Sequence, residues 1–199
     1  MAESDISVNG RGVIADEWFE RAERVPMTKC VTRAVLMSVL SPLEGTRALE
    51  IGSGSGAMTV ELARAVGSEG RVTSIEISSS AADLTRRNLE RAGYMDRVEL
   101  IEGKAPKSIP IGVFGTVFIG GHGEELEAIM GTSVDRMEAG SRLVLTSITP
   151  RSTARALAYL EVLGLGVGFW RMHSSVGARF GSDWLPLGNN PVDIIWGDR

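Results

Sequence analysis

The sequence predicts an α/β fold in which a mostly parallel, seven-stranded sheet ends in an antiparallel hairpin at its edge. Apolar strand-like runs alternate with helical segments from residue 47 to residue 163, which implies parallel pairing through right-handed crossovers. A glycine-rich segment at residues 52–56 directly follows the first of these runs. The alternation stops near the C-terminus, because the runs at 166–174 and 192–196 have no helix between them. We therefore expect these last two runs to pair in antiparallel fashion.

The N-terminal part of the chain precedes the alternating region. Residues 1–12 are polar and contain glycine, so we expect a loose arm, and residues 15–23 predict a short helix. Every fourth residue is apolar over residues 27–40, which is the period of one helix face, and Pro42 ends this helix.

The remaining elements follow in alternating order. Short apolar runs predict strands at residues 47–52, 71–77, 98–102, 116–119 and 142–147. Helical periodicity and cap residues predict helices at residues 56–66, 78–91, 126–137 and 151–163. The segment that joins the last two strands, residues 175–190, is rich in glycine and in apolar side chains.

Length and composition narrow the class of protein. A chain of 199 residues suits a single domain, residues 1–199, with a sizeable core. A net charge of -4 argues against a general nucleic-acid binder. No apolar run approaches the roughly 20 residues that span a bilayer, and the acidic start is unlike a signal peptide. Two histidines and one cysteine, widely separated, give no metal-ligand spacing. We expect a cytoplasmic protein that binds no metal, membrane or nucleic acid.

The glycine-rich segment is the strongest indication of a bound nucleotide. Residues 49–56 read Leu-Glu-Ile-Gly-Ser-Gly-Ser-Gly, and Glu76 closes the next strand. Glycines let the backbone approach a ligand, and a carboxylate at the second strand end binds a ribose diol. NAD enzymes share this plan, but Glu50 lies where S-adenosylmethionine (SAM) enzymes usually carry an acid. The expected SAM contacts are Thr28, Glu50, Gly52, Ser53, Gly54, Ser55, Gly56, Glu76, Gly103, Lys104 and Ala105.

Two further loops are expected at the carboxyl ends of the strands, where open α/β sheets bind ligands. Residues 103–105 follow the third strand and are expected near the adenine. Residues 120–123, Gly-Gly-His-Gly, follow the fourth strand and would expose backbone amides beside the transferable methyl group of SAM. His122 is the candidate acid–base residue, although a tight turn with a surface histidine would read the same. His173, within a strand-like run, is interpreted as structural.

Cations near the opening of the expected binding site would suit a polyanionic substrate. Thr28 and Lys29 stand at the expected start of the 27–40 helix, where free amides give a positive potential. The residues expected to bind substrate are Lys29, Gly120, Gly121, Gly123, Arg151 and Arg179.

Several motifs together resemble the CbiT family, which also occurs as the C-terminal half of CobL. They are Ala-Asp-Glu-Trp-Phe at 15–19, Val-Pro-Met-Thr-Lys at 25–29, the glycine segment at 49–56, Glu-Gly-Lys-Ala-Pro at 102–106, Val-Phe-Ile-Gly-Gly-His-Gly at 117–123 and Asn-Pro-Val at 190–192. The resemblance runs over almost the whole chain. Lys104 stands where family members usually carry Glu or Asp.

The resemblance implies a Rossmann-like, class I SAM-dependent methyltransferase of cobalamin biosynthesis. Such an enzyme methylates C-15 of a precorrin-6B-type tetrapyrrole and removes the ring C acetate carboxylate as carbon dioxide. It also implies a homo-oligomer, of tetrameric form, and a possible C(5)-methyltransferase partner; the apolar segment at 175–190 supports self-association. Three alternatives remain open from the residues alone: an RNA methyltransferase of the same fold, a non-catalytic SAM- or corrinoid-binding module, and an NAD-linked oxidoreductase.

Overall fold

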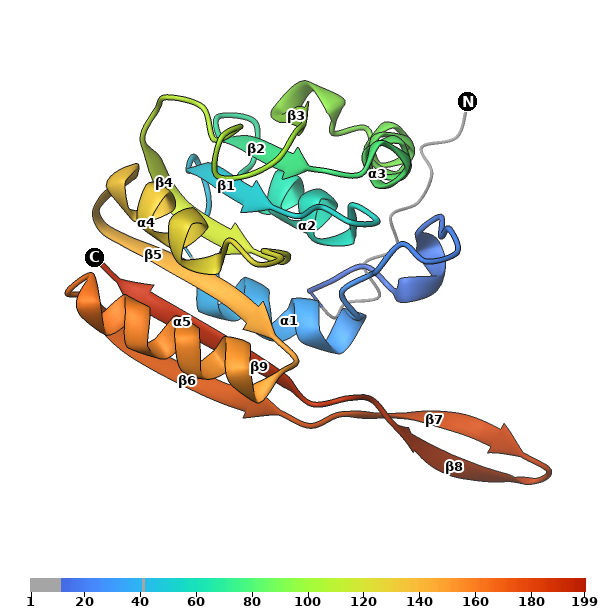
Figure 1. Cartoon of the computed structure of the whole chain (residues 1–199). Coiled ribbons are helices and arrows are strands. Elements are labelled where there is room, and N and C mark those ends of the chain that lie inside the picture. The colour runs from blue at the N-terminus through green and yellow to red at the C-terminus, as the bar shows by residue number, and fades with distance from the viewer. Residues whose placement is uncertain (1–11, 41) are drawn as a thin grey trace.

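A computed structural model describes residues 12–40 and 42–199, and the expected loose arm lies almost wholly outside these residues. The main sheet has seven strands in the order β3-β2-β1-β4-β5-β9-β6 (Figure 1). They are β1 (Arg47–Ile51), β2 (Arg71–Glu76), β3 (Val98–Glu102), β4 (Phe114–Ile119), β5 (Met137–Ser147), β6 (Gly166–Met172) and β9 (Val192–Asp198). All neighbours pair parallel except β9, which runs antiparallel to both β5 and β6. This arrangement confirms the predicted sheet and its antiparallel edge.

Helices cover both faces of the sheet (Figure 1). One face carries α1 (Cys30–Leu40), α2 (Ala57–Ala65) and α3 (Ser79–Ala92), and the other carries α4 (Leu126–Asp135) and α5 (Pro150–Val162). Successive residues of a strand point to opposite faces, so each central strand supplies both cores.

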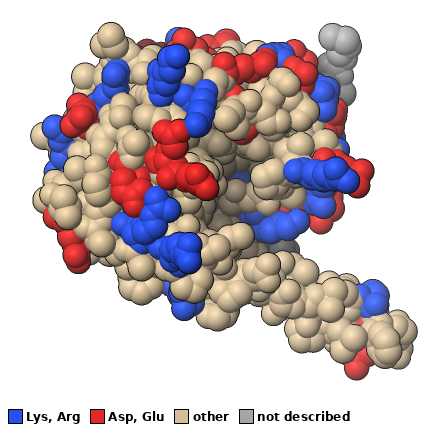
Figure 2. All heavy atoms as spheres, viewed as in Figure 1, with Lys and Arg blue, Asp and Glu red and all other residues tan. Residues whose placement is uncertain are grey.

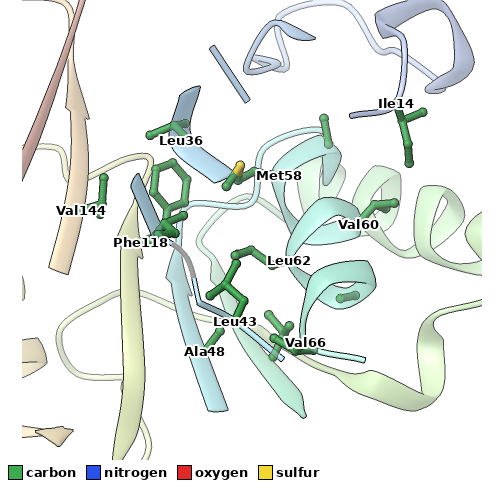
Figure 3. Close-up of a cluster of buried hydrophobic side chains, with 14 of the residues drawn as sticks. Ile14, Leu36, Leu43, Ala48, Met58, Val60, Leu62, Val66, Phe118 and Val144 are labelled. Atoms are coloured by element: carbon green, nitrogen blue, oxygen red, sulfur yellow. The ribbon is translucent and has the colours of Figure 1, made fainter. Parts of the chain in front are cut away.

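The core between α1, α2 and the sheet shows this alternation clearly. Phe118 of β4 points to this face together with Leu36 of α1 and Met58 of α2 (Figure 3). Its neighbours in β4, Val117 and Ile119, belong to the opposite core. All five side chains are almost fully buried. This packing on both faces fixes the positions of the strands. The loops that follow their carboxyl ends therefore lie along one edge of the sheet.

The N-terminal segment differs from the prediction in two places. Residues 15–23 contain only a 3-10 turn, η1 (Asp16–Trp18), and α1 begins at Cys30 instead of residue 27. Residues ahead of α1 are bound to the glycine-rich segment at residues 52–56, because the Ser55 amide donates to the Pro26 carbonyl at 3.1 Å. The Asp16 carboxylate accepts the Cys30 amide at 2.8 Å and so caps α1 from outside the helix.

The segment between β6 and β9 forms its own hairpin, which the sequence did not reveal. Strands β7 (Ser175–Phe180) and β8 (Asp183–Gly188) pair antiparallel as a separate two-stranded sheet. The hairpin projects well beyond the body of the molecule (Figure 1). Its surface is almost entirely uncharged (Figure 2), with Arg179 and Asp183 as its only charged residues.

Candidate cofactor and methyl-transfer site

The glycine loop lies between two other segments of the chain. A β-carbon on Gly52 would stand 2.8 Å from the Gly121 nitrogen, and one on Gly54 would stand 2.7 Å from the Pro26 carbonyl oxygen. Both glycines also have a positive φ, +83° and +56°. Only glycine combines this backbone conformation with such close contacts. The loop, the N-terminal segment and the 120–123 loop therefore converge, as the sequence predicts.

Glu76 ends β2 beside the glycine loop. Its Oε2 accepts the Gly54 amide and its Oε1 accepts the Ser78 amide, each at 2.9 Å. A carboxylate offers about four acceptor positions, so two remain for a diol. The side chain is nearly buried, and two backbone amides fix its orientation. This geometry fits the ribose contact expected of Glu76.

The loop after β3 lies against the same strand end. The Gly103 amide donates to the Glu76 carbonyl at 2.8 Å, which places residues 103–105 beside the expected ribose. Lys104 is exposed and forms an ion pair with Glu125 near the start of α4. Its ammonium group thus faces the loop after β4.

The side chains of the loop serines point into the protein. The Ser53 hydroxyl accepts from the Thr85 hydroxyl at 2.9 Å, and the Asn88 amide donates to the Ser55 carbonyl at 2.8 Å. A β-carbon on Gly56 would stand 2.8 Å from the Thr85 α-carbon. Ser53, Ser55 and Gly56 therefore fasten the loop to α3, and the backbone is the part that can face a ligand.

Glu50 differs from the expectation of direct cofactor contact, because its side chain is completely buried beneath the loop. Its Oε2 accepts hydrogen bonds from the hydroxyls of Thr59 in α2 and Ser74 in β2, both at 2.6 Å. Its Oε1 has no hydrogen-bond partner among the described residues. Burial raises the pKa of Glu50 to about 7, against the two hydrogen bonds, which lower it. Glu50 supports the loop from below.

Glu50→Gln is expected to remove a pH dependence of stability. The folded protein binds the Glu50 proton more tightly than the unfolded chain, because the pKa rises from 4.5 to about 7. The stabilisation is therefore fully present below the unfolded value and is lost as pH rises through the folded one. Wild type should lose roughly 1–3 kcal/mol of unfolding free energy across this window relative to the variant. Urea unfolding across the window measures the difference, and parallel curves would contradict the assignment.

A cavity of about 430 Å³ opens beside the 120–123 loop. Figure 2 shows a hollow in the middle of this face of the molecule. The segment before α1, the loop after β4 and the end of β5 line the cavity, through Pro26, Met27, Thr28, Lys29, Thr32, Gly120, Gly121, His122, Gly123, Thr146, Ser147, Ile148, Thr149, Ser152 and Val192. Six residues predicted at the cofactor or substrate mouth, Thr28, Lys29 and 120–123, therefore come together here.

Thr28 and Lys29 reach the cavity for a reason other than the one predicted. They precede α1, and a buried arginine of α1 holds them in place. Arg33 donates to the Thr28 carbonyl at 2.5 Å and pairs with Asp16 at 2.8 Å. Its amide also donates to the Lys29 carbonyl at 2.9 Å. The cavity wall is thus fixed by a fully buried guanidinium group.

The loop after β4 presents a histidine and fewer unpaired amides than expected. The amides of Gly120 and Gly121 both donate to the Ile51 carbonyl, at 2.8 and 3.1 Å. The expectation that these two amides face the ligand is therefore wrong. His122 is half-buried, and its Nδ1 lies 2.7 Å from the Gly123 carbonyl oxygen. A carbonyl only accepts, so Nδ1 carries the proton and Nε2 is left as an acceptor.

Two predicted substrate cations lie away from this cavity. Arg151 is exposed in the first turn of α5 and does not line the cavity. Arg179 belongs to β7 in the projecting hairpin, where its guanidinium stacks 4.6 Å from the Trp184 ring centroid. The prediction that Arg179 lies in a loop at the mouth is wrong for the single chain, because residues 175–180 form a strand.

The precorrin methyltransferase domain model matches residues 17–184 of the chain. The chain belongs to the precorrin methyltransferase family. A relative from Pyrobaculum calidifontis, named as a cobalt-precorrin-6B C(15)-methyltransferase (decarboxylating), is 39% identical over 183 residues, which cover 92% of this chain and 93% of the relative.

Two solved structures share this fold closely. The precorrin-8w decarboxylase of Methanobacterium thermoautotrophicum superposes with a TM-score of 0.87 at 29% identity, covering 92% of this chain and 98% of that one. The precorrin-6y C5,15-methyltransferase structure of Geobacter metallireducens gives a TM-score of 0.87 at 27% identity, covering 94% and 97%. These matches confirm the class I methyltransferase fold.

Membership of the precorrin methyltransferase family favours one of the readings left open by the sequence. It supports the tetrapyrrole enzyme over an RNA methyltransferase or an NAD-linked oxidoreductase. Across residues 12–40 and 42–199, no helix has the length and apolar character needed to cross a membrane.

The sequence did not predict one wall of the cavity of about 430 Å³. Thr146, Ile148 and Ser152 line it at the end of β5 and the start of α5. The position of β5 could have indicated this wall, because β5 lies next to β4 and its carboxyl end must reach the same edge of the sheet.

Proposed function

We propose that this protein transfers a methyl group from SAM to C-15 of a precorrin-6B-type tetrapyrrole and releases the ring C acetate carboxylate as carbon dioxide. The observation that carries the proposal is the cavity lined by the Gly-Gly-His-Gly loop, which packs against Gly52 of the glycine loop, in a chain whose family is established. The decarboxylating C(15)-methyltransferase name of the Pyrobaculum relative supports the reaction.

The residues present fit SAM as the cofactor. Glu76 keeps two acceptor positions for a ribose diol, and the backbone of Gly52 and Gly54 forms a surface without side chains. The first turn of α2 supplies amides for the carboxylate of the methionine part. When bound, SAM supplies an electrophilic methyl group on sulfur. The chain's own task is to hold that methyl group beside the cavity.

The reaction requires little beyond alignment and one proton acceptor. Bound SAM would supply its methyl group to a carbon between two pyrrole-type rings, which is nucleophilic as an enamine, and the thioether product would be the leaving group. The ring carbon then loses its proton, and the proposed acceptor is Nε2 of His122, the ring nitrogen that does not lie against the Gly123 carbonyl. In the second event the acetate carboxylate leaves as carbon dioxide, its electron pair enters the conjugated system, and a proton replaces it on carbon. Holding the reactants in line supplies most of the acceleration.

A single assay tests the proposal. The protein is incubated with SAM and precorrin-6B, with and without cobalt, and mass spectrometry separates a methyl gain from a loss of carbon dioxide. Both mass changes are expected, and the comparison identifies the preferred form of the substrate. Cofactor binding without turnover would instead indicate a binding module, and methylation of tRNA would indicate the RNA alternative.

We also propose a homo-oligomer, of tetrameric form, that assembles through the β7–β8 hairpin. An isolated two-stranded hairpin is only marginally stable in water. Phe180 and Trp184 are nevertheless 68% and 57% exposed, next to the exposed Leu185 and Leu187. A second chain that covers these side chains would remove them from water.

Light scattering is expected to give the mass of four chains, and replacing both Trp184 and Leu187 with serine should shift it toward one. The control is Val162→Ser, which changes an apolar residue on α5 that is even more exposed, at 77%. A subunit-sized mass for the unmodified protein at micromolar concentration would refute the proposal.

The remaining proposals concern partner and location. A separate C(5)-methyltransferase is proposed to act on the same tetrapyrrole, because the Geobacter structure is named for both the C5 and C15 reactions. A cytoplasmic location is proposed, in keeping with a single cysteine and so no internal disulfide.

A further inference from the structure

The cavity of about 430 Å³ beside the 120–123 loop, the proposed methyl-transfer cavity, adjoins a second cavity of about 500 Å³ at the ends of β5 and β6 and the start of β9. Ser147, Ile148 and Thr149 line both cavities and so form a wall that the two share. A ligand larger than one cavity can therefore extend across these residues into the other.

The shared wall is apolar where it is most exposed. The Ile148 side chain is 72% exposed although it lies at the mouth of both cavities. A flat, partly apolar macrocycle that lies against Ile148 would remove it from water. The two cavities on either side would then receive the edges of the macrocycle.

The second cavity contains an arginine whose orientation is fixed from behind. Arg171 of β6 donates from Nε and Nη2 to the two carboxylate oxygens of Asp193 in β9, at 2.7 and 2.8 Å. Asp193 is 4% exposed and also accepts from the Thr153 hydroxyl at 2.6 Å. This buried carboxylate fixes the plane of the guanidinium group.

The opposite edge of that guanidinium group is available to a ligand. No hydrogen bond joins Nη1 of Arg171 to another residue within the described ranges 12–40 and 42–199, and the side chain is half exposed. His173 and Asn190 line the same cavity and add further hydrogen-bonding groups. His173 was interpreted as structural from its strand-like run, but it is exposed and follows the end of β6. A planar guanidinium edge with donors beside it is well suited to a carboxylate.

We propose that this second cavity binds a peripheral carboxylate of the tetrapyrrole, with Arg171 as its main donor, while the macrocycle lies against Ile148. The inference rests on the proposed function and deepens it by assigning a substrate subsite outside the methyl-transfer cavity. Asp193 offsets the charge of Arg171, so recognition depends on the directed hydrogen bonds more than on a net positive charge.

The test compares Arg171→Met with a matched variant. The Michaelis constant for the tetrapyrrole is expected to rise roughly 10- to 100-fold in Arg171→Met, the loss of one charge-assisted contact. The affinity for S-adenosylhomocysteine (SAH) should stay unchanged. The control is Arg142→Met, because Arg142 forms the equivalent two-bond pair with Asp198 between β5 and β9 and lines neither cavity.

A second ligand makes the result independent of turnover. Binding of a polycarboxylated porphyrin to the SAH-bound protein is followed by absorbance, beside the same porphyrin with its carboxylates converted to methyl esters. Arg171→Met should weaken binding of the acid form and leave the ester form unaffected. Equal effects on both forms, or the same effect in Arg142→Met, would overturn the assignment. If the porphyrin binds through Arg171 but precorrin-6B is not methylated, the proposed function fails and the carboxylate subsite stands.

Discussion

Replacing Glu76 with alanine is expected to weaken SAH binding by about 100-fold or more. The substitution removes both acceptors of a ribose diol contact, and each hydrogen bond to a charged group contributes roughly 1.5–3 kcal/mol. It also frees the Gly54 amide, which donates to Glu76 at 2.9 Å, so the glycine loop loses a contact that fixes its shape. Both effects act on the same ligand.

Calorimetry with SAH measures this loss directly. Glu102→Ala is the matched control, because Glu102 ends the neighbouring strand β3, pairs in register with Glu76 and carries an exposed side chain. Its affinity for SAH should equal that of wild type. An unchanged dissociation constant in Glu76→Ala would remove Glu76 from the cofactor site.

The sheet could be predicted from the sequence because its signals are local. Short apolar runs separated by helical periods specify parallel strands, and the missing helix after residue 174 specified the antiparallel edge. The start of α1 could not be predicted in the same way. The helical period at 27–29 is overruled by the Ser55–Pro26 hydrogen bond and by the Asp16 carboxylate, which accepts the Cys30 amide; both contacts join segments that are separated in the sequence.

The site was predictable to the extent that it depends on strand ends. Glu76 and the 120–123 loop lie where the order of strands requires them. The Arg171–Asp193 pair joins residues that are 22 positions apart across the antiparallel edge, and no local motif indicates it. The β7–β8 hairpin was not predicted because its strands bury no face within the chain, and because its glycines and Pro186 are typical of a loop.

Gly121→Val is expected to reduce methyl transfer more than His122→Ala does. A β-carbon on Gly121 would meet only the Gly52 α-carbon, at an ordinary 3.8 Å, so the fold accepts a side chain there. That side chain would occupy the space above the glycine loop, where the methyl group must meet the tetrapyrrole. Since alignment dominates the reaction, we expect a loss in kcat of about 100-fold or more.

His122→Ala removes the proton acceptor and leaves the approach path open. The expected loss in kcat is about 10- to 100-fold, at or below the roughly 10²–10⁴ of an essential general base. Gly166→Val is the control for the valine, because its β-carbon would also meet only ordinary contacts, at 3.7 Å or more, at the far end of β6. Single-turnover kinetics with SAM and precorrin-6B separate these outcomes. If His122→Ala abolishes methyl transfer while Gly121→Val leaves it intact, proton transfer and not alignment limits the reaction. If neither variant changes turnover, the substrate binds elsewhere.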